Sequence, residues 1–472
     1  MTDTSPSTAD VRIWDIETMK GARTTRYRVR WRTSSKRHVR TLATRKLADT
    51  FRSSLVSATR AGTPFDITSG LPVTMLEAIE ASAPAITWLD HATAYVDAKW
   101  TTASPRHRKG IAEALANVTV ALSPQSPARP DARTLRTVLR HHAFNPSTRE
   151  APLTPDVQVA LDWLRAHSRP VADLADPKVA RQALEAISTT LDGRPAQPST
   201  VARKRATLTN ALHFAVEQGH LTTNPLDGIR TAHRFQTTVV SRQAVVNPRQ
   251  ARVLLDAVRH NDPAHHAFFA VLYYAGLRPA EARALTVSDC TLPTSGWGKA
   301  DLRGSRQSSG AAWTDDGAAE EQRSLKHRAD SEVRTVPLHP DLVAILRAHL
   351  AKFETGVDGL LFVTRTGKAG RPLPPPYANA VSMKSIYRAW SAARQEALSP
   401  REYDSALAKR PYDLRHACLS TWLNAGVPAA QVAEWAGHST QVLLRVYAKC
   451  IDGGAESAMR RIEESMIDSD EA

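Results

Sequence analysis

The 472-residue sequence is poor in cysteine, with only Cys290, Cys418 and Cys450. Because the three are far apart and odd in number, neither a disulfide framework nor a cysteine-based zinc site is expected. No run approaches 18 apolar residues, and the polar N-terminus lacks the apolar core of a signal peptide. We therefore expect a cytoplasmic protein with no membrane partner.

Metal-binding patterns are also missing. The 17 histidines include no HExxH motif, and the carboxylates are not grouped as two-metal catalysis requires. This argues against metal-dependent nucleases and transposases. We expect no metal and no cofactor.

Acidic residues are the third shortage. Lys and Arg number 62 against 47 for Asp and Glu, which gives a net charge of +15. Residues 20–46 hold eleven basic and no acidic residues. Such an excess predicts a polyanionic partner, with nucleic acid the first candidate. The alternative is an evenly solvated basic surface.

The N-terminal segment 1–66 predicts a small basic domain. Residues 1–10 are expected to be disordered. Residues 27–32 alternate apolar and arginine side chains, which indicates a strand with one cationic face, and 38–43 predicts a returning strand. Thr44 is suited to cap a helix that runs to about residue 61. A strand face of this kind can enter a DNA groove, and the alternative is a solvated sheet; the candidate contacts are Arg28, Arg30, Arg32, Lys36, Arg37 and Arg40.

Residues 67–84 predict a linker, and 85–235 predict a helical domain. The expected helices cover 86–100, 105–122, 132–143, 155–168, 177–191 and 198–219. Two basic clusters on them are candidate phosphate contacts, although solvated helix faces often carry such clusters; they comprise Arg106, Arg108, Lys109, Arg203, Lys204 and Arg205.

Residues 236–472 predict a second, mostly helical domain. A turn at Gly276 separates an apolar helix from one that begins near Pro279. Residues 286–338 predict two or three strands with an excursion across about 304–322. The expected fold class is therefore mainly α with small β-sheets, in several domains.

Taken one at a time, four residues of this last domain are weak indications of a functional site. Arg278 follows a sharp turn, and Glu281 can brace it as an i,i+3 partner. Arg415 lies in a predicted first helical turn, for which Asp413 is a candidate N-cap. His438 separates two predicted helices, and Tyr447 lies on the last of them. Each has an ordinary structural interpretation.

Together, in this order and spacing, these residues resemble the catalytic domain of the tyrosine recombinase, or phage integrase, family. The resemblance covers about 237–452 and is most specific over 411–452. The helical middle is similar to the family's core-binding domain, and the N-terminal unit resembles its arm-binding domain. The resemblance implies that Tyr447 forms a 3′-phosphotyrosyl bond, that Arg278, Arg415 and His438 hold the phosphate, and that Glu281 supports the arginines.

The family's strand lysine maps best to Lys326, with Lys299 as the alternative. The sequence departs from the family at Tyr412, where a histidine usually precedes the second arginine by three residues. A phenol can donate a hydrogen bond to phosphate or relay a proton, but its pKa near 10 makes it a weaker base. We expect an active enzyme with altered proton handling, in which His416 and Asp413 organise the turn.

The resemblance implies a site-specific recombinase that integrates and excises a mobile element. The expected partners are double-stranded DNA attachment sites, with the protein a homotetramer on DNA and nucleoid-associated. An excision factor and a host DNA-bending protein are further candidates. The tail 453–472 is expected either to dock on a neighbouring protomer or to fray. The alternatives are a type IB-like topoisomerase and a non-catalytic DNA-binding regulator.

Overall fold

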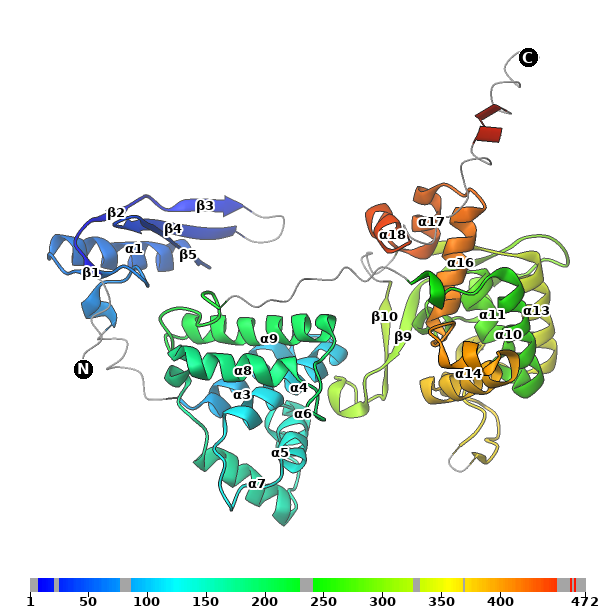
Figure 1. Cartoon of the computed structure of the whole chain (residues 1–472), viewed down its shortest axis with the longest axis horizontal. Coiled ribbons are helices and arrows are strands. Elements are labelled where there is room, and N and C mark those ends of the chain that lie inside the picture. The colour runs from blue at the N-terminus through cyan, green and yellow to red at the C-terminus, as the bar shows by residue number, and fades with distance from the viewer. Residues whose placement is uncertain are drawn as a thin grey trace. The chain divides into compact units, whose positions relative to one another are not determined.

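The computed structural model describes residues 7–20, 25–76, 86–229, 241–325, 332–367, 370–447, 459–460 and 462–463. Contacts divide the chain into two compact units, Met1–Phe235 and Gln236–Ala472 (Figure 1). The predicted fold class, mainly helical with small antiparallel sheets, is confirmed. No described helix is both long and apolar enough to cross a membrane.

The N-terminal part of the first unit contains a small sheet with a long helix packed against it. The central strand β4 (Thr25–Thr33) pairs along one edge with β5 (Lys36–Leu42). Its other edge pairs with β2 (Val11–Ile13) and β3 (Glu17–Lys20). Helix α1 (Arg45–Arg60) begins at Thr44, whose side chain accepts the Leu47 N–H. The two predicted strands and the helix are confirmed, whereas β2 and β3 were not predicted.

The alternation of β4 decides which face is buried. Val29 and Trp31 pack with Phe51 and Leu55 of α1, whereas the arginines between them lie on the opposite face. Burial of the apolar side chains thus fixes the register of the strand.

Two expectations about the edges of this domain are wrong. Strand β1 (Ser7–Thr8) pairs with β6 (Phe65–Asp66), so residues 7 and 8 are ordered by a strand far away in the sequence. Residues 1–6 of the segment expected to be disordered lie outside the described residues. Leu71 belongs to the same apolar core, and Trp31 donates its indole N–H to Gly70 O over 2.5 Å. The domain therefore extends beyond residue 66.

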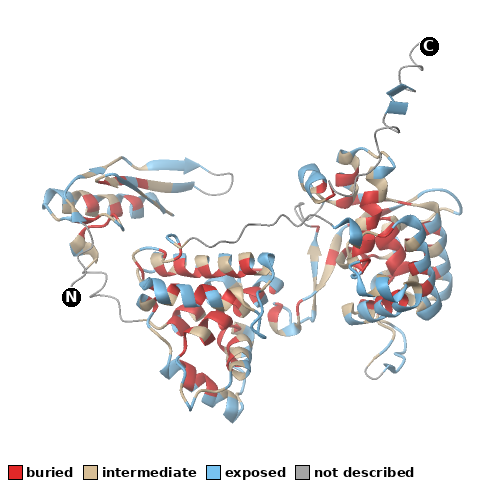
Figure 2. Ribbon diagram, viewed as in Figure 1, coloured by how far each residue is buried: buried red, intermediate tan, exposed pale blue. Residues whose placement is uncertain are grey.

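The rest of the first unit is a helical bundle. Its six predicted helices are confirmed. Prolines begin five of its helices at the first turn, where the missing N–H costs nothing. Helix α4 is buried on most sides and contacts α3, α5, α8 and α9; Figure 2 shows the buried residues where these helices face one another. The helices are α3 (Trp88–Trp100), α4 (Pro105–Leu122), α5 (Ala132–Val138) with a π-helical continuation Leu139–Ala143, α6 (Pro146–Arg149), α7 (Pro155–Ala166), α8 (Pro177–Ser188) and α9 (Pro198–Glu217).

The second unit is built around helix α11 (Pro263–Tyr274). This helix is apolar on almost every side, with Phe268, Phe269 and Leu272 fully buried. It contacts α10, α12, α13 and α16. The helices of the unit are α10 (Pro248–Asn261), α11, α12 (Pro279–Ala282), α13 (Pro340–Lys352), α14 (Met383–Ala397), α15 (Pro400–Asp404), α16 (Tyr412–Asn424), α17 (Ala429–Ala436) and α18 (Thr440–Tyr447).

Five strands interrupt these helices in the described part of the unit. Strands β7 (Cys290–Thr291), β8 (Gly298–Leu302) and β11 (Arg334–Leu338) form one antiparallel sheet. Strands β9 (Gly304–Ser308) and β10 (Glu320–Ser324) form a separate hairpin. The predicted excursion across 304–322 is thus itself a hairpin. Buried Arg283 anchors it by donating to Arg306 O over 3.1 Å and to Glu320, a non-local contact that no local sequence pattern reveals.

Candidate functional site

A left-handed turn positions the first arginine of the site. Gly276 ends α11 with φ of +61°, and a Cβ there would lie 3.2 Å from Cys418 Sγ. A residue with a side chain would be strained in this position. The turn leaves Arg278 as the residue preceding α12, with Pro279 in the first helical turn.

Glu281 lies at the centre of the site and is almost fully buried. It accepts the backbone N–H of Arg278 over 2.8 Å and the Arg278 guanidinium over 2.6 Å. Arg334 on β11 donates to both carboxylate oxygens over 3.0 and 2.7 Å. One carboxylate therefore fixes two guanidinium groups from separate elements.

Arg415 brings a third guanidinium from helix α16. Its side chain is fully buried and donates to Gly276 O and, over 2.6 Å, to Ala436 O. It lies 3.9 Å from Glu281 Oε2. Its contacts with the turns after α11 and α17 join the two segments that carry Arg278 and His438.

The charges of this cluster do not balance. Burial alone would raise the pKa of Glu281, but Arg334, Arg278 and Arg415 outweigh it and lower that pKa to about 2. Three guanidinium groups around one ionised carboxylate leave an excess of two positive charges. The Nε atoms of Arg334 and Arg415 are buried without a hydrogen-bond partner among the described residues. The cluster is therefore suited to bind an anion.

His438 supplies a neutral donor to the same cluster. Burial, aided by Arg415 and Arg278, lowers its pKa to about 3, so the ring is uncharged at neutral pH. The guanidinium of Arg415 can only donate, so His438 Nε2, 3.2 Å away, must accept. The ring hydrogen then lies on Nδ1, which is buried and has no partner among the described residues.

Gly437 places His438 beside the arginines. It ends α17 in the left-handed region, with φ of 64°. Its carbonyl accepts from Arg278 over 2.8 Å, and a Cβ there would lie 2.3 Å from Arg334 Nη1. Glycine is required both for the turn and for this close approach.

Tyr447 ends α18 and its side chain is fully buried. Its hydroxyl lies 2.7 Å from Nδ1 of His416, the residue that follows Arg415. Tyr412 packs edge-on against the same imidazole, with ring centroids 4.9 Å apart. Burial lowers the pKa of His416 to about 4. The three rings form a chain that runs from the first turn of α16 to Tyr447.

The structure brings most of the predicted site residues together. Arg278, Glu281, Arg415 and His438 share one cluster, and Tyr412 and Tyr447 both contact His416. The proposed leaving-group lysine, Lys326, lies outside the described residues. Asp413 is not an N-cap, because α16 already begins at Tyr412; its carboxylate instead accepts from the backbone N–H and the guanidinium of Arg410, which precedes the helix.

The alternative lysine points away from the arginines. Lys299 pairs with Pro337 in the sheet, whereas Arg334 pairs with Leu302, so their side chains lie on opposite faces. The ammonium group of Lys299 lies 3.1 Å from Asp301. This geometry does not favour Lys299 as a member of the site.

Sequence reasoning missed Arg334 and assigned His416 only to the turn. Arg334 shares the buried face of β11 with Val336 and Leu338, and an arginine in such a pattern signals a buried acidic partner. The hydrogen bond between His416 and Tyr447 spans 31 positions and has no local signal.

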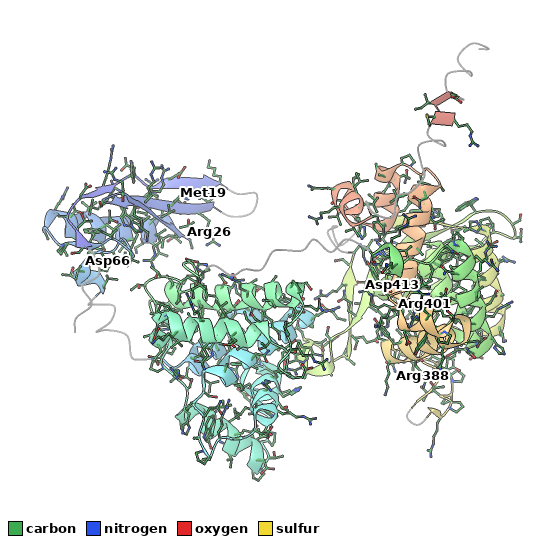
Figure 3. All side chains as sticks on the ribbon, viewed as in Figure 1. Met19, Arg26, Asp66, Arg388, Arg401 and Asp413 are labelled. Carbon is green, nitrogen blue, oxygen red and sulfur yellow. The ribbon has the colours of Figure 1, made fainter. Side chains whose placement is uncertain are left out.

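The outer face of the N-terminal sheet gathers arginines from three strands. The pairing register places on one face Arg12, Arg26, Arg28, Arg30, Arg32 and Arg37. Glu17 lies between two of them, 3.8 Å from Arg28 and 3.6 Å from Arg30. Figure 3 labels Arg26 and its strand partner Met19 at one end of this sheet.

Two residues expected on the cationic face lie elsewhere. Arg40 is on the helix-covered face, with its guanidinium 4.6 Å from the centre of the Phe51 ring. Lys36 donates to Thr68 O over 2.8 Å. The local charge run did not separate the two faces, because β5 carries basic residues on both.

The helical clusters are smaller than their charge suggested. Arg108 is buried over Trp100 and donates to Trp100 O over 2.8 Å. Lys204 is buried and lies 3.0 Å from Glu113, and Arg205 donates to Ile229 O over 3.1 Å. The exposed cations of these clusters are Arg106, Lys109 and Arg203.

No group of three or more metal-ligating side chains occurs among the described residues. Residues 244–452 match the model of the phage integrase family. No curated protein matches the chain.

Solved structures of similar arrangement include residues 82–397 of the Tn1549 transposon integrase in complex with circular intermediate DNA, at 17% identity and a TM-score of 0.44, covering 67% of this chain and 96% of that one. The XerH recombinase bound to palindromic difH has 13% identity and a TM-score of 0.44, covering 80% and 95%. Lambda integrase residues 75–356 bound to DNA have 13% identity and a TM-score of 0.38, covering 65% and 92%.

Proposed function

We propose that this chain, which matches the phage integrase family over residues 244–452, acts as a tyrosine site-specific recombinase. It cuts and rejoins DNA through a phosphotyrosyl intermediate. The DNA substrates are paired attachment sites of a mobile element. Tyr447 is the nucleophile, and the arginine cluster holds the scissile phosphate.

The observation that carries this proposal is the charge excess around Glu281. A phosphodiester carries one negative charge, and its transition state of attack gathers a second on the non-bridging oxygens. Three guanidinium groups held by one carboxylate leave two positive charges, which matches that developing charge. Guanidinium is suited to the task because its fork binds two phosphate oxygens and stays protonated.

Each residue has a distinct task in this reaction. Arg278 and Arg415 bind the non-bridging oxygens, and the Nδ1–H of His438 donates to the same oxygens. Arg334 and Glu281 hold these donors in place before substrate arrives. Tyr447 attacks phosphorus and the 5′-oxygen leaves. The protein–DNA ester retains the bond energy, so rejoining needs no nucleotide cofactor.

The arginine face of the N-terminal sheet supports a second DNA contact. Six guanidinium groups on one face form a dense cationic surface that suits a phosphate backbone or a groove edge. A binding unit apart from the cutting unit favours integration and excision of a mobile element, with a tetramer acting on two sites. An excision factor and a DNA-bending protein would act on this assembly of tetramer and DNA.

One experiment separates this function from a topoisomerase and from a regulator. The full-length protein is incubated with two duplexes that carry the same binding site, selected from a random-sequence pool, and with a supercoiled plasmid that carries one copy. Exchange of flanking DNA between the duplexes is the expected result. Relaxation without exchange would indicate a type IB-like topoisomerase. Binding with neither product would indicate a regulator.

A further inference from the structure

The hydroxyl of Tyr447 has a neighbour that phosphate binding does not explain. His416 Nδ1 lies 2.7 Å from Tyr447 Oη, and the two ring centroids are 5.5 Å apart. The two residues come from α16 and α18, so the contact depends on the packing of the unit. Both elements meet within a buried apolar cluster that includes Leu419 and Leu443.

A tyrosine nucleophile needs a proton acceptor. The ordinary pKa of a phenol is about 10, so roughly one molecule in a thousand is ionised at pH 7. A base within hydrogen-bonding distance removes this limit by taking the proton as the new bond forms. The His416 ring lies within that distance in the structure.

The surroundings of His416 keep its imidazole neutral and therefore able to accept a proton. Burial is the main cause that lowers its pKa to about 4; Asp413 opposes this shift, and Arg410 and Arg415 add to it. From the first turn of α16 the ring of Tyr412 covers one side, and from α18 the facing group is Tyr447 itself. The imidazole is therefore neutral at pH 7, and its Nδ1 can take a hydrogen from the phenol.

We propose that His416 is the catalytic base for Tyr447, an assignment that rests on the proposed function. During cleavage the Oη–H bond breaks and the proton passes to His416 Nδ1. The Oη electron pair forms the bond to phosphorus, and the bond from phosphorus to the 5′-oxygen breaks. The leaving oxygen takes a proton from a separate donor, for which the family resemblance implies Lys326. During rejoining His416 returns its proton to the departing phenolate.

This assignment gives Tyr412 a different task from that of a base. Tyr412 lies four residues before His416, on the same face of α16, and its ring packs edge-on against the imidazole. It holds the imidazole in orientation and excludes water from one side.

The test measures the rate of covalent adduct formation in a single turnover. The probe is a duplex selected from a random-sequence pool by binding to full-length Tyr447→Phe protein, then nicked beside the cleavage position mapped with wild type. The key variant is His416→Asn, whose amide oxygen can accept the phenolic hydrogen bond but not the proton. The matched control is His349→Asn, another buried histidine that lies outside the cluster.

With His416→Asn we expect a rate about 10²–10⁴-fold lower at pH 7. The variant's rate should rise about tenfold per pH unit as solvent ionises the phenol. DNA affinity and thermal unfolding should stay close to wild type. Added imidazole should restore part of the rate of His416→Ala but not that of Tyr447→Phe.

Three outcomes would overturn the assignment. A wild-type rate and pH profile in His416→Asn would show that another group takes the proton. A faster rate would show that the contact restrains Tyr447 instead of activating it. Wild-type protein that forms no adduct with any selected duplex would overturn the proposed function and this assignment with it, whereas the first two results leave the proposed function intact.

Discussion

Arg334 and Glu281 form a two-pronged ion pair, with nitrogen to oxygen distances of 3.0 and 2.7 Å. Only 2% and 3% of the two side chains is exposed. The pair joins β11 to α12, and the same carboxylate holds Arg278. A buried pair of this kind fixes geometry, because loss of either partner leaves the other charge uncompensated.

The first prediction concerns that carboxylate. Glu281→Gln keeps the shape of the side chain but removes the charge that compensates three arginines. We expect the second unit to lose about 3–5 kcal/mol of unfolding free energy. The measurement is urea unfolding of the full chain at pH 7, followed by hydrogen exchange in peptides from residues 241–447. Exposed Glu434→Gln is the control and should change the value by less than about 0.5 kcal/mol. Equal effects of the two variants would contradict the account.

Arg415 should be irreplaceable by lysine. Lysine keeps the charge but cannot reach Gly276 O, Ala436 O and a phosphate with one planar fork. Arg415→Lys is expected to slow adduct formation by about 10²–10³-fold while DNA affinity changes little. Arg259→Lys, an exposed substitution on α10, should leave the rate unchanged. A near-normal rate in Arg415→Lys would show that charge alone suffices.

The second unit should lose stability in mild acid. The pKa values of His349 and His416 are lowered to about 4 and that of His438 to about 3, from the ordinary 6.5, with burial the largest cause. Between pH 6.5 and 4 the unfolded chain therefore binds more protons than the folded chain. The unfolding free energy should fall through this window, by about 1.4 kcal/mol per pH unit for each histidine.

Urea unfolding at pH 7, 6 and 5 measures this slope. His349→Gln removes one of the three groups and should reduce the slope by about one proton. Below pH 4.5 Glu281 takes up a proton in the unfolded chain but not in the folded chain, where its pKa is lowered to about 2, and this difference should add to the destabilisation. An unfolding free energy that stays constant from pH 7 to pH 5 would contradict the burial of neutral imidazoles.

The arginine face of the N-terminal sheet should govern the salt dependence of binding. Replacing Arg28, Arg30 and Arg32 by Gln should reduce the slope of log affinity against log salt by about one unit per lost phosphate contact. The control removes the same charge from α1 on the other side of the sheet, with Arg45, Lys46 and Arg60 changed to Gln. Equal slopes in the two triple variants would indicate that this face of the sheet is a solvated surface that does not contact DNA.

The sequence predicted those parts of the fold that local patterns determine. The alternation in 27–32 defined β4 because apolar and charged side chains must take opposite faces. Prolines marked helix starts, as at α4 and α9, because proline suits a first turn. Strand β1 and the β9–β10 hairpin were not predictable in the same way, since distant pairing and the Arg283 anchor determine them.

The candidate site shows the same difference between features that the sequence predicts and features that depend on packing. The spacing of Arg278, Arg415, His438 and Tyr447 suggested a common site, and the first three do share one cluster. The bond from Tyr447 to His416 was not predictable, because it depends on how α18 packs against α16. Charge counts also overestimated the number of exposed cations in the helical clusters, because the sequence alone does not show that Arg108 and Lys204 are buried.

The role of Tyr447 as nucleophile is tested by mapping the residue to which DNA becomes attached. A nicked duplex selected by binding to the protein is cleaved, the adduct is digested with trypsin and nuclease, and the modified peptide is identified by mass spectrometry. A nucleotide remnant is expected on the peptide 446–449, and no adduct is expected from Tyr447→Phe. A remnant on Tyr412, or an adduct that persists in Tyr447→Phe, would contradict this role of Tyr447.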